Sequence, residues 1–91
     1  MRRIFKYSFL WNHQVTLELP KHCQILKWRI INNYLFFWAL IDDEKEKVQR
    51  TFRVYGTGDL LPSERAEALE YQETLIEEKD NYVWHVFEVL A

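Results

Sequence analysis

Apolar and polar residues alternate with a period of two through most of the chain, and this pattern predicts short β-strands. Successive side chains of a strand point to opposite faces, so each of these runs is expected to bury one face and expose the other. Residues 34–41 are apolar at every position, which indicates a strand covered on both faces at the centre of a sandwich or barrel, or one that lines an interface. The predicted strands are residues 3–11, 14–19, 24–31, 34–41, 48–55, 70–76 and 82–90.

Turn residues separate these runs. Asn32-Asn33 is typical of a two-residue hairpin connection, because Asn tolerates positive φ. Gly56-Thr57-Gly58 ends the fifth run, and glycine is used where φ is positive or where another group approaches closely. In the third run, Leu26 is expected to share a face with Trp28 and Ile30. In the last run the predicted inward set is Val83, His85, Phe87 and Val89.

Residues 60–79 are open to two interpretations. Pro62-Ser63 is followed by strong helix formers, and propensity alone would extend a helix to Lys79. Residues 70–76 also alternate, and a strand there would pair with the last run as a hairpin. We expect a short helical insert over residues 62–69 followed by a strand, with a single helix through Lys79 as the alternative.

Length and composition indicate a single domain over residues 1–91, because a chain this short has no room for a second core. The predicted fold is mainly β, a small antiparallel β-sandwich or partly open barrel of about seven strands with one short helical insert. Four Trp, five Tyr and six Phe make an unusually aromatic chain. This surplus indicates either a very aromatic core or rings on a surface that meets a partner, and we expect a homo-oligomer.

Net charge and cysteine content limit the binding partners and the cellular compartment that we expect. The net charge of −2 disfavours broad nucleic-acid binding, which usually needs a basic stripe. Residues 64–80 are mostly acidic, as expected of a solvated face or of a patch for a basic partner. Cys23 is the only cysteine, which points to a reducing compartment. Neither a signal peptide nor an apolar run of ~20 residues is found, so we expect a cytoplasmic protein without membrane contact.

Motifs for catalysis are lacking. Gly56-Thr57-Gly58 is too short for a phosphate loop and no Lys-Ser or Lys-Thr pair follows it. His13, His22 and His85 show no recurring ligand spacing. We therefore expect no enzymatic activity, no metal and no cofactor.

Two groups of residues are candidates for binding. Arg53, Tyr55 and the turn Gly56-Thr57-Gly58 combine a guanidinium, a ring and backbone N–H groups, which suits a nucleotide-like anion. The alternative is that Arg53 pairs with an acid on the next strand. His85 is either a hydrogen-bonded core residue or part of that ligand site. Tyr82 and Trp84 share the opposite face of the last run and would form an interface if that face is exposed.

Several strings resemble a family of small uncharacterised bacteriophage and prophage proteins over nearly the whole chain. Phe-Arg-Val-Tyr-Gly-Thr-Gly at 52–58 and His-Val-Phe-Glu at 85–88 are the most specific of them. The resemblance implies a phage setting and favours a strand at residues 71–77, but no established activity. This chain departs from the family at Asp59-Leu60-Leu61-Pro62 and the acidic insert after it. The remaining strings are Ile4-Phe5-Lys6-Tyr7, Leu19-Pro20-Lys21, Trp38-Ala39-Leu40 and Trp84 before His85.

Small phage proteins without catalytic motifs commonly act on the host by binding. The first hypothesis is a counter-defence protein that sequesters a nucleotide-like immune signal or covers a host defence protein. The second hypothesis is a structural or accessory phage protein that assembles through aromatic faces. Both rest on the resemblance and on the residues above, and fold alone does not imply either function.

Overall fold

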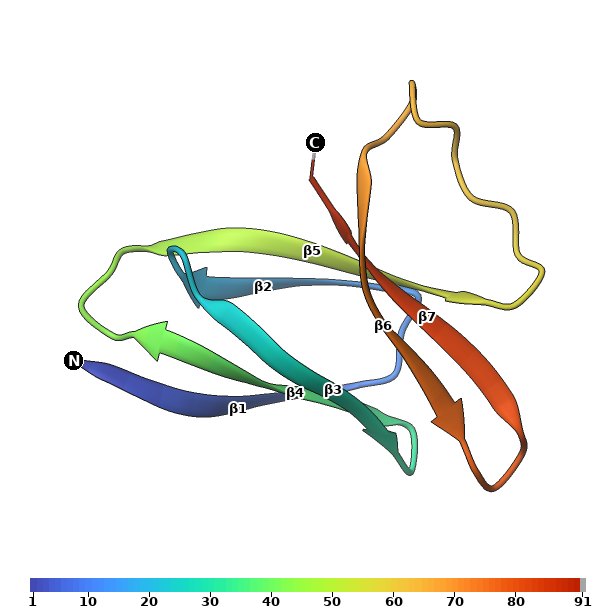
Figure 1. The fold of residues 1–91 in the computed structure, drawn as a ribbon, viewed down its shortest axis with the longest axis horizontal. Helices are drawn as coiled ribbons and strands as arrows, with labels where there is room; N and C mark the ends of the chain where they lie inside the picture. The colour runs from blue at the N-terminus through green and yellow to red at the C-terminus, as the bar shows by residue number, and fades with distance from the viewer. Residues whose placement is uncertain (91) are drawn as a thin grey trace.

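Seven antiparallel strands form two sheets that share one hydrophobic core in the computed structural model, which describes residues 1–90 (Figure 1). The mainly β, sandwich-like prediction is confirmed, and the two sheets do not close into a barrel within the described residues. The strands are β1 (Arg2–Leu10), β2 (Gln14–Pro20), β3 (Gln24–Ile31), β4 (Tyr34–Asp42), β5 (Lys47–Gly56), β6 (Leu69–Glu77) and β7 (Tyr82–Val89).

The sheets have the strand orders β1-β4-β3 and β2-β5-β7-β6. Only β3–β4 and β6–β7 are hairpins between consecutive strands, and the other connections cross between the sheets or follow the long 57–68 loop. The molecule is flat, with extents of 41 × 35 × 17 Å. Each sheet therefore offers one broad face to the core and one broad face to the outside.

The core lies where the alternation predicts it. Leu35, Phe37 and the other odd-numbered residues of β4 are buried, since they face the second sheet. Trp28 of β3 is the centre of an aromatic cluster, with ring centroids 4.5 Å from Phe37 and 5.1 Å from Phe52 of β5. Large rings let this short chain bury the apolar area that it needs.

Three turn predictions have a direct geometric reason. Asn32 and Asn33 both have positive φ, 50° and 67°, as a type I′ hairpin requires. Gly58 has φ 93°, which only glycine adopts readily. Gly56 is needed for close approach instead, because a Cβ there would lie 3.3 Å from the ring of Trp84.

Bulges in two of the edge strands, β3 and β6, shift the predicted alternation of inward and outward residues. The pairing of β3 with β4 is irregular at Leu26, so Leu26 is exposed and does not share the inward face of Trp28. The pairing of β6 with β7 is irregular at Gln72, which moves Tyr71 to the outer face beside Thr74. An extra residue on one strand leaves a ladder intact but reverses the parity beyond it.

The predicted inward face of β7 is wrong. Val86 and Glu88 are buried and Trp84 packs on Trp11, with ring centroids 4.6 Å apart, whereas His85 lies on the outer face. Alternation identifies two faces but not which of them is inside. In β7 the inner face is the one on which the large ring of Trp84 packs and Glu88 has an ion-pair partner.

The predicted helical insert over residues 62–69 is also wrong. Ser63 accepts hydrogen bonds from the backbone N–H groups of Ala66 (2.9 Å) and Glu67 (3.1 Å), and this single turn does not continue. β6 begins at Leu69 because its pairing with β7 outweighs local helix propensity. Residues 1–90 contain no helix that could span a membrane.

A partly buried ion pair lies inside the sandwich. Arg50 of β5 points inward and its guanidinium donates two hydrogen bonds of 2.7 Å to Glu88 of β7. A third donation reaches the carbonyl oxygen of Cys23 at 3.2 Å. The hydrogen bonds that Arg50 donates to Glu88 raise the pKa of Arg50 above its ordinary value. The pair therefore joins β5 and β7 of one sheet to the start of β3 in the other.

We expect Glu88→Ala to lower the free energy of unfolding by about 2–3 kcal/mol, because it leaves the Arg50 guanidinium partly buried without its carboxylate. Urea unfolding followed by tryptophan fluorescence measures this loss. The double variant Arg50→Met/Glu88→Leu should recover most of it, since it removes both charges. A loss below ~0.5 kcal/mol in Glu88→Ala would show that the pair contributes little.

Candidate functional site

Arg53, on the outer face of β5, is held by a carboxylate of the same chain. Its guanidinium donates two hydrogen bonds of 2.7 Å to Glu67 and one of 2.7 Å to the side-chain oxygen of Gln14. The acid comes from the 57–68 loop and not from the neighbouring strand that the sequence suggested. Arg53 therefore clamps this loop to the outer face of β5.

The clamp changes the electrostatics of both partners. Hydrogen bonding to Glu67 raises the pKa of Arg53, with the hydroxyl of Tyr55 at 3.5 Å as a weaker second partner. Hydrogen bonds from Arg53 in turn lower the pKa of Glu67. Both groups stay charged at neutral pH, and the fork of Arg53 has few donors left for a ligand.

A shallow hollow of about 540 Å³ lies beside this clamp. The structure thus brings together three of the predicted ligand-binding residues, Arg53, Tyr55 and Gly58, at one surface. Its volume is in the range of small-molecule sites. The hollow is lined by His13, Gln14, Arg53, Val54, Tyr55, Gly58, Asp59 and Leu60.

His85 belongs to a chain of hydrogen bonds next to the hollow. Its Nε2 lies 2.9 Å from the hydroxyl of Thr57 and its Nδ1 lies 3.0 Å from the hydroxyl of Thr74. Thr74 is also 2.7 Å from the hydroxyl of Tyr71. Both ring nitrogens of His85 are partnered by hydroxyls, so the arrangement is suited to fastening the loop rather than to activating Thr57.

The predicted interface residues lie side by side, with ring centroids 5.8 Å apart, but they differ in burial. Tyr82 is exposed, whereas Trp84 is half-buried and its indole N–H donates to Glu77 at 3.3 Å. Trp84 therefore packs against the core, and Tyr82 supplies most of the exposed ring surface. An interface role for Tyr82 stays a prediction.

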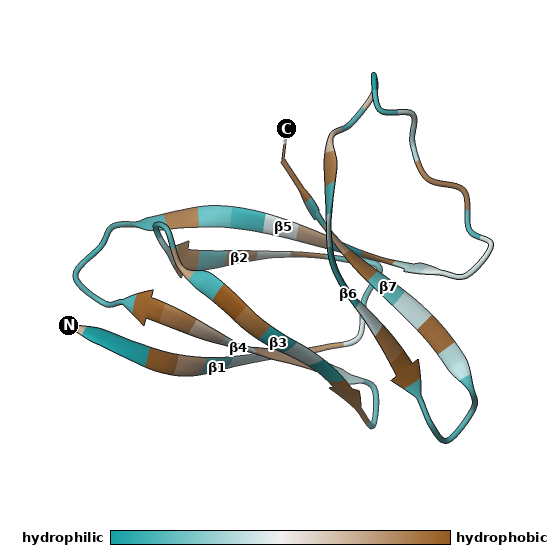
Figure 2. Ribbon diagram, viewed as in Figure 1, coloured by the Kyte–Doolittle hydropathy of each residue, from teal (hydrophilic) through white to brown (hydrophobic). Residues whose placement is uncertain are grey.

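The outer face of the β1-β4-β3 sheet carries an apolar patch that sequence reasoning did not identify. Ile4 and Leu10 of β1 expose 61% and 62% of their surface, and Tyr34 of β4 exposes 52%. Hydrophobic residues continue along all three strands of this sheet (Figure 2). We call this surface the basic–apolar face. Its outward residues are Arg2, Ile4, Lys6, Ser8 and Leu10 of β1, Tyr34, Phe36, Trp38, Leu40 and Asp42 of β4, and Gln24, Lys27, Arg29 and Ile31 of β3.

Cations accompany these apolar side chains. The ammonium of Lys6 lies 4.4 Å from the ring centroid of Phe36 and 5.9 Å from that of Trp38. Arg29 is exposed beside them, and Lys27 reaches Glu73 of β6 at 3.4 Å. Among the fourteen outward residues, all within the described part of the chain, Asp42 at the end of β4 is the one carboxylate, against the cations Arg2, Lys6, Lys27 and Arg29. The face therefore combines positive charge with exposed apolar area.

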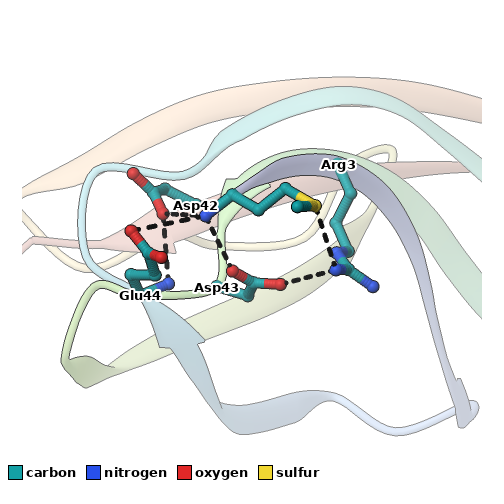
Figure 3. Close-up of polar contacts among 5 residues, drawn as sticks. Arg3, Asp42, Asp43 and Glu44 are labelled. Atoms are coloured by element: carbon teal, nitrogen blue, oxygen red, sulfur yellow. Dashed lines mark hydrogen bonds and ion pairs between the residues drawn. The ribbon is translucent and has the colours of Figure 1, made fainter.

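The nearest carboxylates at the end of β4 are occupied. The amino group of Met1 lies 3.2 Å from Asp42, 3.0 Å from Asp43 and 3.5 Å from Glu44, and Arg3 lies 2.9 Å from Asp43 (Figure 3). These contacts raise the pKa of the amino group, chiefly through Asp43. The acidic β4–β5 loop thus does not cancel the positive charge of the basic–apolar face.

The sequence did contain a signal for this face. The apolar run 34–41 was expected either to be covered on both faces or to line an interface. In the structure one side of β4 faces the core, and the described residues place no second layer over the other. Ile4 and Leu10 also alternate against Tyr7 and Phe9, so their outward position follows once those rings are assigned to the core.

A second hollow, of about 990 Å³, lies between the β3–β4 and β6–β7 hairpins. It is lined by charges of both signs, including Lys27, Arg29, Glu77 and Asp80, so it selects for no single ligand charge. No group of three or more metal-ligating side chains is found among residues 1–90.

The lowered pKa of Glu67 predicts a titration that can be measured. The carboxylate form is favoured in the folded protein, so the clamp contributes stability above the ordinary pKa of 4.5 and loses it as pH falls through the lower folded value. An NMR titration of the Glu67 side chain should give a midpoint below 4.5, and Arg53→Met should return it to about that value. Equal midpoints in both proteins would contradict the clamp.

Comparison with known proteins gives one match, and it carries no function. Neither a curated protein nor a solved structure matches the chain significantly. The model of a family described as a domain of unknown function, DUF7352, matches residues 1–91. The chain belongs to the DUF7352 family.

Proposed function

We propose that the protein is a non-enzymatic, phage-type binding protein whose working surface is the basic–apolar face. The exposure of Ile4 and Leu10 beside Lys6 is the observation that carries this proposal. Soluble proteins rarely expose contiguous apolar patches larger than a few hundred Å², and such patches mark interaction sites. Four cations against one carboxylate, Asp42, which the amino group of Met1 already contacts, favour an acidic partner.

Two roles are compatible with such a surface. In the first, the protein covers a host defence protein in the cytoplasm of an infected cell. In the second, it is an accessory phage protein that assembles with copies of itself. Both use the same face, and both need apolar contact in the centre and ion pairs at the sides.

The proposal is tested by placing a photo-crosslinking phenylalanine analogue at Tyr34 in infected bacterial cells. We expect covalent adducts at Tyr34 and none at the control position Gln49, which is exposed on the outer face of the other sheet. Adducts with a mass that is a multiple of the chain's own indicate assembly, and adducts with a host protein indicate covering. Adducts at neither position, or equally at both, would contradict the proposal.

Sequestration of a nucleotide-like signal is the second candidate, supported by the hollow beside Arg53 and Tyr55. A phosphate would have to displace Glu67 from the guanidinium, which makes this site the weaker candidate.

Native mass spectrometry separates the two candidates. The protein is purified from cells with and without active nucleotide-signalling immunity. Sequestration predicts a nucleotide-sized adduct only in the first preparation, lost in Arg53→Ala and retained in Arg29→Ala, which changes the other sheet. The binding-face proposal predicts no such adduct in either preparation.

A further inference from the structure

The 57–68 loop carries side chains whose chemistry complements the basic–apolar face. Leu60 is 95% exposed, the most exposed large hydrophobic residue described, and Leu61 beside it is exposed too. Asp59 and Glu64 flank these leucines with carboxylates. An acid-flanked apolar segment is the partner expected for a face that combines Ile4 and Leu10 with cations.

The loop is also held in one arrangement. Asp59 accepts the backbone N–H of Gly56 at 2.7 Å and its own N–H donates to the carbonyl of Gly56 at 3.1 Å. The Arg53–Glu67 pair fastens the other end. A segment that is already ordered loses less conformational entropy on binding, so binding through the exposed leucines costs less free energy.

A chain cannot place this loop on its own basic–apolar face. The loop projects beyond the ends of β5 and β6, at the opposite side of the molecule from the start of β1 (Figure 1). It is anchored to the other sheet, through Arg53 of β5. The complementary surfaces are therefore available only to two different copies.

From these observations we infer that the basic–apolar face binds residues 59–64 of a second copy of this chain, so that copies join head to tail. The inference rests on the proposed function, since it names the occupant of the same face. Leu60 and Leu61 cover the apolar side chains of β1 and β4, and Asp59 and Glu64 meet Lys6 and Arg29.

Direct stacking of two basic–apolar faces is disfavoured by charge. Lys6 is paired with Trp38, at the middle of β4. A two-fold axis through the middle of the face would therefore bring Lys6 of one copy against Lys6 or Lys27 of the other. Burying like charges without partners is costly, whereas the head-to-tail contact gives each cation a carboxylate.

The size of the contact sets its strength. Three strands of up to nine residues present a face of about 30 × 14 Å. This is less than the ~800 Å² per partner of a standard stable interface, so we expect association in the micromolar range. Because the two surfaces differ, each added copy leaves one of each free, and the assembly is open or forms a ring.

The test uses two variants that each damage one side of the contact. Leu10→Asp changes the face and Leu60→Lys changes the loop, and both residues are exposed, so neither change disturbs the core. Sedimentation velocity over a concentration series should show reversible assembly of the wild type. Each variant alone should associate about ten- to a hundredfold more weakly. Gln49→Asp is the control with the same added charge on the other sheet.

Mixing the two variants gives the decisive result. Leu10→Asp keeps an intact loop and Leu60→Lys keeps an intact face, so the mixture should form a 1:1 heterodimer that grows no further. A monomeric wild type, self-association of Leu60→Lys at wild-type strength, or no association in the mixture would each overturn the inference. A monomeric wild type that still gives host adducts at Tyr34 would leave the proposed function standing.

Discussion

The constraint on which the rest depends is that β4 is apolar on both faces while a two-layer sandwich buries only one of them. The odd-numbered residues, Leu35 to Ile41, join Trp28 and Phe52 in the core. The even-numbered residues point away from the core and are covered to different extents: Phe36 is buried, whereas Tyr34 is 52% exposed. The Lys6 side chain lies over Phe36, because a lysine can lay its methylene stem on an apolar surface and keep its charge in water. The area that stays exposed is the area that we propose a partner covers.

Arg50 and Arg53 of β5 both form ion pairs within the chain. Arg50 and Arg53 lie on opposite faces of one strand, and each donates two hydrogen bonds to a single carboxylate, Glu88 inside and Glu67 outside. The first pair joins the strands of the core and the second positions a loop. The cations of the basic–apolar face have weaker internal partners, since Lys6 meets only rings within the cation–π contacts described. On our proposal, an acidic partner is therefore recognised by the other sheet.

The sequence was sufficient for the strands and their turns, because both depend on local chemistry. Alternation placed seven strands, and Asn32-Asn33 and Gly58 supplied the positive φ values. The sequence did not indicate which face of β7 lies inside, because alternation alone treats the two faces alike. The contact between Trp84 and Trp11 decides between them. Bulges at Leu26 and Gln72 are equally invisible, because they arise from pairing with another strand. Arg53 and His85 share the outer face of their sheet although His85 was predicted to face inward, and the acid that binds Arg53 comes from a distant loop.

Self-assembly and host binding would compete for one surface. A host segment that fits the basic–apolar face must have the chemistry of residues 59–64, namely apolar side chains flanked by carboxylates. A copy whose face is occupied by a neighbour's loop cannot bind that segment, so the two equilibria are linked by mass action. The small contact area is then an advantage, because a micromolar self-contact releases the face to any tighter partner. In the proposed assembly the apolar face of each copy is covered, and a partner of higher affinity would shift the equilibrium toward single copies.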